Sequence, residues 1–121
     1  MATKAEYPNV MTFDEYQKQA MKTAIMRGDD FWSTGVYRTL GLVGEAGEVA
    51  EKVKKIARDK KGKISQADKA EIIKELGDVL WYLQGIADFL EVNFDEVAKT
   101  NLKKLSSRKT RGRIGGSGDN R

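Results

Sequence analysis

The sequence predicts a small all-α protein, and three observations support this. The chain has 121 residues, of which 40% are hydrophobic and 33% charged, as expected for one globular domain. Its only proline is Pro8, so no proline interrupts the segments that follow. In those segments apolar residues recur at helical spacing. We therefore expect a bundle of four helices.

The helices are expected at 13–26, 36–58, 66–90 and 94–107. Three of them start at residue pairs typical of helix N-caps: Thr12 with Glu15, Ser65 with Asp68, and Asn93 with Glu96. Phe31 and Trp32 fall in the first connecting loop. Gly41, Gly44 and Gly47 recur every three residues, which predicts close approach of another backbone.

The predicted organisation is an N-terminal arm at 1–11, a helical domain at 12–107 and a flexible basic tail, rich in Gly and Ser, at 108–121. The helix at 66–90 is apolar on more than one side, which is typical of a central helix. Four helices of this length are barely enough to bury its apolar sides. We therefore expect oligomerisation to complete the bundle.

The chain contains no cysteine and no histidine, which removes thiolate chemistry, sulfur-bound zinc and the commonest general base. Any metal must be bound through oxygen, which suits magnesium, manganese or calcium. The longest apolar run, 79–83, is too short to cross a bilayer, and no secretory leader opens the chain. We expect a cytoplasmic protein with no membrane partner.

Four acids are the strongest candidates for chemistry: Glu45, Glu48, Glu75 and Asp78. Each pair has a spacing of three residues, which places its members about 60° apart around a helix. Both pairs lie mid-helix among apolar and glycine residues, where a carboxylate is costly unless a cation compensates it. If the two helices form an antiparallel pair, the acids meet and bind a hard divalent cation. That arrangement suits metal-assisted hydrolysis of a phosphate anhydride.

These residues resemble a known family. The segments EAGE at 45–48 and KELGDVLWY at 74–82 are similar to the E-x-x-E and E-x-x-D motifs of MazG-type all-α nucleotide pyrophosphohydrolases. NLKKLSSR at 101–108 resembles the segment N-x-x-K-L-x-x-R of that family's last helix. The resemblance covers about residues 12–110.

The resemblance implies hydrolysis of a nucleoside triphosphate to the monophosphate and pyrophosphate, with Mg²⁺ (or Mn²⁺) held by the four acids. One acid would orient the attacking water, and which one stays open. The resemblance also implies a homodimer or homotetramer, and substrate contacts from Asn101, Lys104 and Arg108. These three share one helix face, as their spacing shows independently. Lys52, seven residues after Glu45, is a further candidate for a phosphate contact.

Two alternatives stay open. In the first, the substrate is a specialised one, such as dUTP, dCTP or phosphoribosyl-ATP; the sequence shows no set of residues that reads a base, so specificity stays open. Alternatively, the net charge of +4 reflects a non-enzymatic helical module that binds nucleic acid or protein. We do not expect nucleic acid as a partner, because a carboxylate cluster without metal repels a phosphate backbone.

Overall fold

A computed structural model describes residues 6–121. The first five residues of the expected arm at 1–11 lie outside the described residues, and the rest of the arm is exposed and without helix. The elements are α1 (Phe13–Met21), one π-helical turn η1 (Phe31–Gly35), α2 (Val36–Lys60), α3 (Gln66–Phe89) and α4 (Phe94–Thr110). Since residues 6–121 contain four α-helices and no strand, the predicted all-α class is confirmed.

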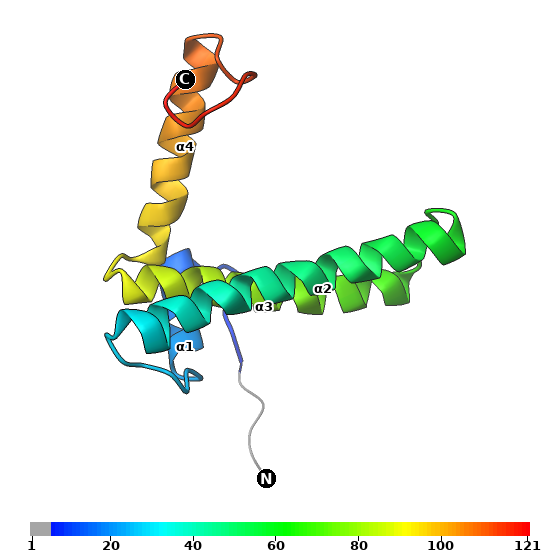
Figure 1. The fold of residues 1–121 in the computed structure, drawn as a ribbon, viewed down its shortest axis with the longest axis horizontal. Coiled ribbons are helices and arrows are strands. Elements are labelled where there is room, and N and C mark those ends of the chain that lie inside the picture. The colour runs from blue at the N-terminus through cyan, green and yellow to red at the C-terminus, as the bar shows by residue number, and fades with distance from the viewer. Residues whose placement is uncertain (1–5) are drawn as a thin grey trace.

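The two longest helices, α2 and α3, lie side by side as an antiparallel hairpin that dominates the molecule (Figure 1). Lys61 and Gly62 take positive φ angles of 53° and 79° and turn the chain between them. Ser65 and Asp68 then form the predicted capping box, with bonds of 2.9 and 3.1 Å. Both helices end within two residues of the expected positions.

Helix α1 packs against α3 and α4 but ends at Met21, five residues before the predicted end. Side chains explain the early stop, because they take carbonyls that a further helical turn would need. The Thr23 hydroxyl donates to the carbonyl of Ala20 at 2.7 Å, and Arg27 donates to that of Ala24 at 2.8 Å. Ile25, which lies within the predicted helix at 13–26, falls outside α1 and is 93% exposed.

The predicted loop around Phe31 and Trp32 is wrong, because these residues form η1. The Asp30 carboxylate caps this turn by accepting from the backbone N–H of Ser33 at 2.7 Å. The turn runs directly into α2, so α2 has no side-chain cap of its own.

Arg38 is the largest fully buried side chain of the described residues, and it ties three segments together. Its guanidinium donates to the carbonyl of Gly85 on α3 and to that of Met26 after α1, the latter at 2.8 Å. A third contact, to the Asp88 carboxylate, measures 3.3 Å. Arg38 therefore fixes α2 against α3 and against the segment that follows α1.

Helix α4 begins at the predicted residue but is capped differently. Asn93 makes no side-chain cap bond, and α1 supplies the acceptors instead. The N–H of Phe94 donates to the Gln17 side chain at 3.1 Å, and that of Asp95 donates to Asp14 at 2.8 Å. From this anchor α4 projects away from the hairpin and continues to Thr110, three residues beyond the predicted end (Figure 1).

The chain buries little apolar surface. Its accessible surface is 9470 Å², whereas a compact monomer of this mass exposes about 6,500 Å². The buried apolar residues are few and mostly small: Ala20, Ala24, Ile56, Ala87 and Phe94. Among the described helices, none is both long and apolar enough to span a bilayer.

The cap of α3 leads to a pH-dependent prediction. A hydrogen bond from Lys60, followed by those from Ser65, lowers the pKa of Asp68 to about 2. The stabilisation from its carboxylate is therefore complete above the ordinary pKa and is lost as the pH falls through about 2. We expect Asp68→Asn to lower the urea midpoint at pH 7, and its difference from wild type to shrink between pH 4 and pH 2. Asp29→Asn, at an exposed loop position, is the control and should match wild type throughout.

Candidate functional site

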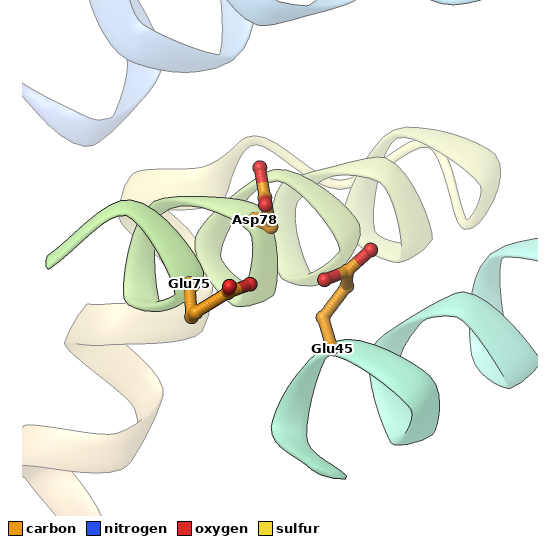
Figure 2. A group of neighbouring side chains, drawn as sticks. All are labelled: Glu45, Glu75 and Asp78. Atoms are coloured by element: carbon orange, nitrogen blue, oxygen red, sulfur yellow. The ribbon is translucent and has the colours of Figure 1, made fainter. Parts of the chain in front are cut away.

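Three of the four predicted acids converge between α2 and α3. Glu45 reaches across from α2 toward Glu75 and Asp78 on α3 (Figure 2). One carboxylate oxygen from each residue lies within 4.8 Å of the others. Glu45 and Glu75 are half-buried and Asp78 is exposed, so the cluster is held by the hairpin and open to solvent.

Glu48, the fourth predicted acid, is exposed on α2 and is not a member of this group. It is still close enough to affect Glu45 electrostatically. Burial raises the pKa of Glu45, and the charges of Asp78, Glu75 and then Glu48 raise it further. The four acids therefore share one electrostatic environment, although three of them share the geometry.

The ligand atoms and their spacing fit a divalent cation. All three groups offer carboxylate oxygens, the ligands that magnesium and manganese prefer. Oxygens on opposite sides of one magnesium ion lie about 4.2 Å apart, so small side-chain shifts suffice for the group to share an ion. Lys52 compensates part of the negative charge, with its ammonium 3.4 Å from the Glu75 carboxylate. Lys52, predicted to contact phosphate, is thus paired with an acid of the cluster.

A cavity of about 330 Å³ adjoins the acids. Glu45 and Asp78 form part of its lining, and the remaining lining residues are apolar, aromatic or hydroxyl-bearing: Thr23, Ile25, Met26, Tyr37, Trp81 and Tyr82. The acids therefore open directly into a largely aromatic space.

Hydrogen bonds and ring contacts hold the aromatic walls. The Trp81 indole N–H donates to the Thr23 hydroxyl at 2.9 Å and to the Ala20 carbonyl at 3.3 Å. Tyr82 meets Trp81 edge-on, with ring centroids 5.1 Å apart. Burial raises the pKa of Tyr82, and a hydrogen bond with Tyr37 raises it further, so its phenol stays neutral at physiological pH.

The glycine spacing of α2 has a partial explanation in this cavity wall. A Cβ at Gly41 would overlap the Tyr82 ring, so glycine lets α2 and α3 approach there. At Gly44 and Gly47 a Cβ would meet nothing within 4 Å among the described residues. The close neighbour at Gly41 is therefore the Tyr82 ring rather than the backbone that the glycine spacing predicted, and Gly44 and Gly47 have no close neighbour among the described residues.

The predicted basic face lies on α4, away from the acids. Asn101 is exposed, and Lys104 pairs with Asp119 of the tail at 3.2 Å. Arg108 is 4% exposed and donates to the backbone carbonyl of Asp119 at 2.7 Å. Across residues 6–121, α4 makes no contact with α2, and Figure 1 shows its C-terminal half standing clear of the hairpin. The structure does not bring this face to the acids of the same chain.

The sequence model of the MazG nucleotide pyrophosphohydrolase domain matches residues 37–112, which include all four acids and the basic face of α4. The chain belongs to this family. It is 53% identical to the Gene 37 protein of Mycobacterium phage L5 over 114 residues, which cover 92% of this chain and all of that protein.

A second relative is the uncharacterized protein YvdC of Bacillus subtilis strain 168. It is 38% identical over 72 residues, which cover 55% of this chain and 68% of the relative. The names of these two relatives specify no substrate. No solved structure matches the chain.

Membership of the MazG family does not by itself identify the residues that line the cavity, and the sequence pattern was not used to predict most of them. Trp81 and Tyr82 follow Asp78 by three and four residues, and Tyr37 precedes Glu45 by two helical turns. That spacing alone places all three beside the acids. Trp32 is not among the residues that line the cavity; it is 76% exposed and contacts Phe31 edge-on.

MazG enzymes are generally metal-dependent, and the acid group leads to a binding prediction. Magnesium or manganese should raise the melting temperature of the metal-free protein, because a ligand at a hundred times its Kd stabilises the fold by about 2.7 kcal/mol. Glu75→Gln and Asp78→Asn should each remove most of this shift. Glu51→Gln, on α2 but outside the group, should retain it. Equal shifts in all three variants would place the cation elsewhere.

Proposed function

We propose that this protein hydrolyses a nucleoside triphosphate to the nucleoside monophosphate and pyrophosphate in a magnesium-dependent reaction. One observation carries the proposal: Glu45 and Asp78 belong to the acid group and also line the aromatic cavity. A substrate with a phosphate chain at one end and a planar group at the other matches that arrangement. Membership of the MazG family supports the same reaction.

The nucleoside lies in the cavity, where Tyr37, Trp81 and Tyr82 offer faces and edges to a sugar and base. The Trp81 N–H is already bonded to Thr23 and Ala20, so Trp81 contributes shape rather than a donor. The phenols of Tyr37 and Tyr82 are the polar groups with which the cavity orients the nucleoside.

At the acids, Glu45, Glu75 and Asp78 would hold the cation, which when bound would supply polarisation of the phosphate chain and a lower pKa of water. Glu48 lies one helical turn from Glu45 and outside the converging group. We assign Glu48 the role of accepting the proton as water attacks. The bond that breaks is the anhydride between the α- and β-phosphates, and pyrophosphate leaves with the bridging oxygen.

The negative charge of the phosphates requires cationic side chains nearby, and the chain has such side chains in two places. Lys52 lies beside Glu75 on the hairpin and would be free to turn toward the phosphates once a cation compensates that acid. Lys104 and Arg108 lie on α4, which does not contact α2 of its own chain among the described residues. They therefore serve the site of a second copy, and the working form is a homodimer or a larger homo-oligomer.

Exposed surface supports the second copy. The chain exposes 9470 Å², about 3,000 Å² more than a compact monomer of its size. Burial of that excess on both chains of a dimer would remove about 6,000 Å² in total, the scale of the largest obligate interfaces, which bury about 2,000–5,000 Å² or more. Large apolar side chains are exposed along the hairpin and along α4: Leu40, Val43, Val53, Ile73, Leu76, Leu83, Val97, Leu102 and Leu105.

Activity is tested on a panel of the common NTPs and dNTPs plus phosphoribosyl-ATP, with magnesium, scored by release of both monophosphate and pyrophosphate. We expect the protein to hydrolyse at least one of these substrates. Hydrolysis of dUTP alone or of dCTP alone would indicate specificity for a single base. Glu48→Gln should lower kcat by roughly 10²-fold or more, the scale of a lost general base, while the thermal shift with magnesium persists. Glu75→Gln should lose both properties.

Asp59→Asn, at an exposed acid paired with Arg58 at the end of α2, is the control and should retain full activity. A protein that leaves the whole panel intact contradicts the proposal. Salt-dependent binding of DNA or RNA that ignores all four acids would instead favour the helical binding module.

The oligomer is tested by light scattering coupled to size-exclusion chromatography. We expect a mass at least twice that of the 13.5 kDa chain. Leu102→Asp, on the exposed apolar side of α4, should shift the protein toward monomer, because it places a charge in the interface. Ile64→Asp, at an exposed apolar residue in the turn between α2 and α3, is the control. A monomeric wild-type protein that still hydrolyses nucleotide would contradict the shared site.

A further inference from the structure

The C-terminal tail, residues 111–121, folds back along the end of α4 and places a carboxylate on the basic face (Figure 1). One oxygen of Asp119 lies 3.2 Å from the Lys104 ammonium and 3.3 Å from the Arg108 guanidinium. Arg108 also donates to the backbone carbonyls of Asp119 at 2.7 Å and Gly118 at 3.4 Å. One acid thus bridges the two cations of α4.

The tail reaches this position through a closed loop. Gly116 and Gly118 have φ angles of 93° and 83°, which side chains other than glycine rarely allow. Arg121 closes the loop by donating to the carbonyls of Gly118 and Ile114, the latter at 3.2 Å. Arg111 holds the carbonyl of Arg121 at 2.8 Å. Asp119 is therefore presented by a defined turn rather than by an extended end.

The tail also covers Arg108. Phe94 and Arg108 are the buried residues of α4, but Phe94 lies at the helix start against α1, whereas Arg108 lies in the last turn and bonds to the tail. The guanidinium Nε of Arg108 is buried without a hydrogen-bond partner among the described residues. A buried donor of this kind is costly, so the closed tail leaves part of the binding capacity of Arg108 unused.

We propose that Asp119 is an internal competitor for phosphate: it occupies Lys104 and Arg108 in the free protein, and an incoming nucleotide displaces it. This inference rests on the proposed function for the phosphate role of the two cations. Asp119 offers the same chemistry as a phosphate, anionic oxygens at hydrogen-bond distance from the cations. The contact is then autoinhibitory and sets the nucleotide concentration at which the site fills.

The contact of Asp119 with the two cations is weak enough for a phosphate group to displace it. Asp119 is 82% exposed, so solvent screens its ion pairs and they are weak. Hydrogen bonds from Lys104 and then Arg108 hold the pKa of Asp119 below its usual range, so it is anionic at neutral pH. A triphosphate brings more charge and more acceptor oxygens than one carboxylate, and it wins the exchange once its concentration is high enough.

Asp119→Asn tests the proposal, because it removes the charge and keeps the shape of an exposed side chain. Two measurements are made on the full chain: calorimetric binding of inorganic pyrophosphate without metal, and KM and kcat for the best nucleotide with magnesium. We expect pyrophosphate to bind roughly two- to fivefold more tightly, the scale of one or two exposed ion pairs. KM should fall by a similar factor while kcat stays unchanged.

Two further variants make the result specific. Asp59→Asn removes an acid of similar exposure that pairs with Arg58 on α2, and it should change neither quantity. Lys104→Met added to Asp119→Asn should abolish the gain in pyrophosphate affinity, because it removes one of the freed cations.

Unchanged or weaker pyrophosphate binding by Asp119→Asn would overturn the proposal and make Asp119 a residue that positions the cations. The two proposals fail separately. If no variant hydrolyses nucleotide but pyrophosphate binds more tightly to Asp119→Asn, the enzyme proposal fails and the competitor stands. If hydrolysis occurs and neither KM nor pyrophosphate affinity responds, the competitor alone fails.

Discussion

The buried guanidinium of Arg38 sets the geometry on which the candidate site depends. A charge with 1% exposure is stable only if acceptors surround it, and here they come from the carbonyls of Met26 and Gly85 and the Asp88 carboxylate. These bonds engage the two terminal nitrogens of the guanidinium, while its Nε is buried without a partner among the described residues. Because Met26 lines the cavity, the same bonds place one cavity wall against α2 and α3. A Cβ at Gly85 would lie 3.2 Å from the Arg38 side chain, so a larger residue there would require Arg38 to shift by a few tenths of an ångström.

The polar bonds of Arg38 matter more than such bonds usually do, because the chain has little apolar core. Ile56 and Phe94 are its only large buried apolar residues among those described, so α2 and α3 pair along one stripe and leave other faces in water. An open hairpin lets the acids at its centre face solvent. The same lack of packing lets α4 stand away from the hairpin. In the proposed dimer, incomplete burial within one chain is what allows two chains to share a site.

Local rules predicted the elements well, and contacts between distant segments account for the errors. The capping boxes at Thr12 and Ser65 are determined within four residues, and both form as expected. The end of α1 depends on Thr23, whose hydroxyl is fixed between Ala20 and Trp81 of another helix, so no local pattern predicts it. The prediction that the acids meet required only that α2 and α3 form an antiparallel pair, and three of the four acids do meet. The position of Arg108 depended on the tail, whose fold has no helical or strand periodicity.

The proposed site consists of an acidic group on the hairpin and a basic group on α4, and each group already has a counter-ion within the chain. Lys52 compensates Glu75 on the hairpin, and Asp119 compensates Lys104 and Arg108 on α4. In the proposed reaction, a divalent cation would take the place of Lys52 at the acids, and phosphate oxygens would take the place of Asp119 at the cations. Metal and nucleotide would then exchange partners that already exist, rather than meeting bare charges. Each exchange would be more favourable once the other ligand is bound, because the freed Lys52 would gain a phosphate partner and the phosphates would gain the metal. The proposal therefore implies that metal and nucleotide each strengthen the binding of the other.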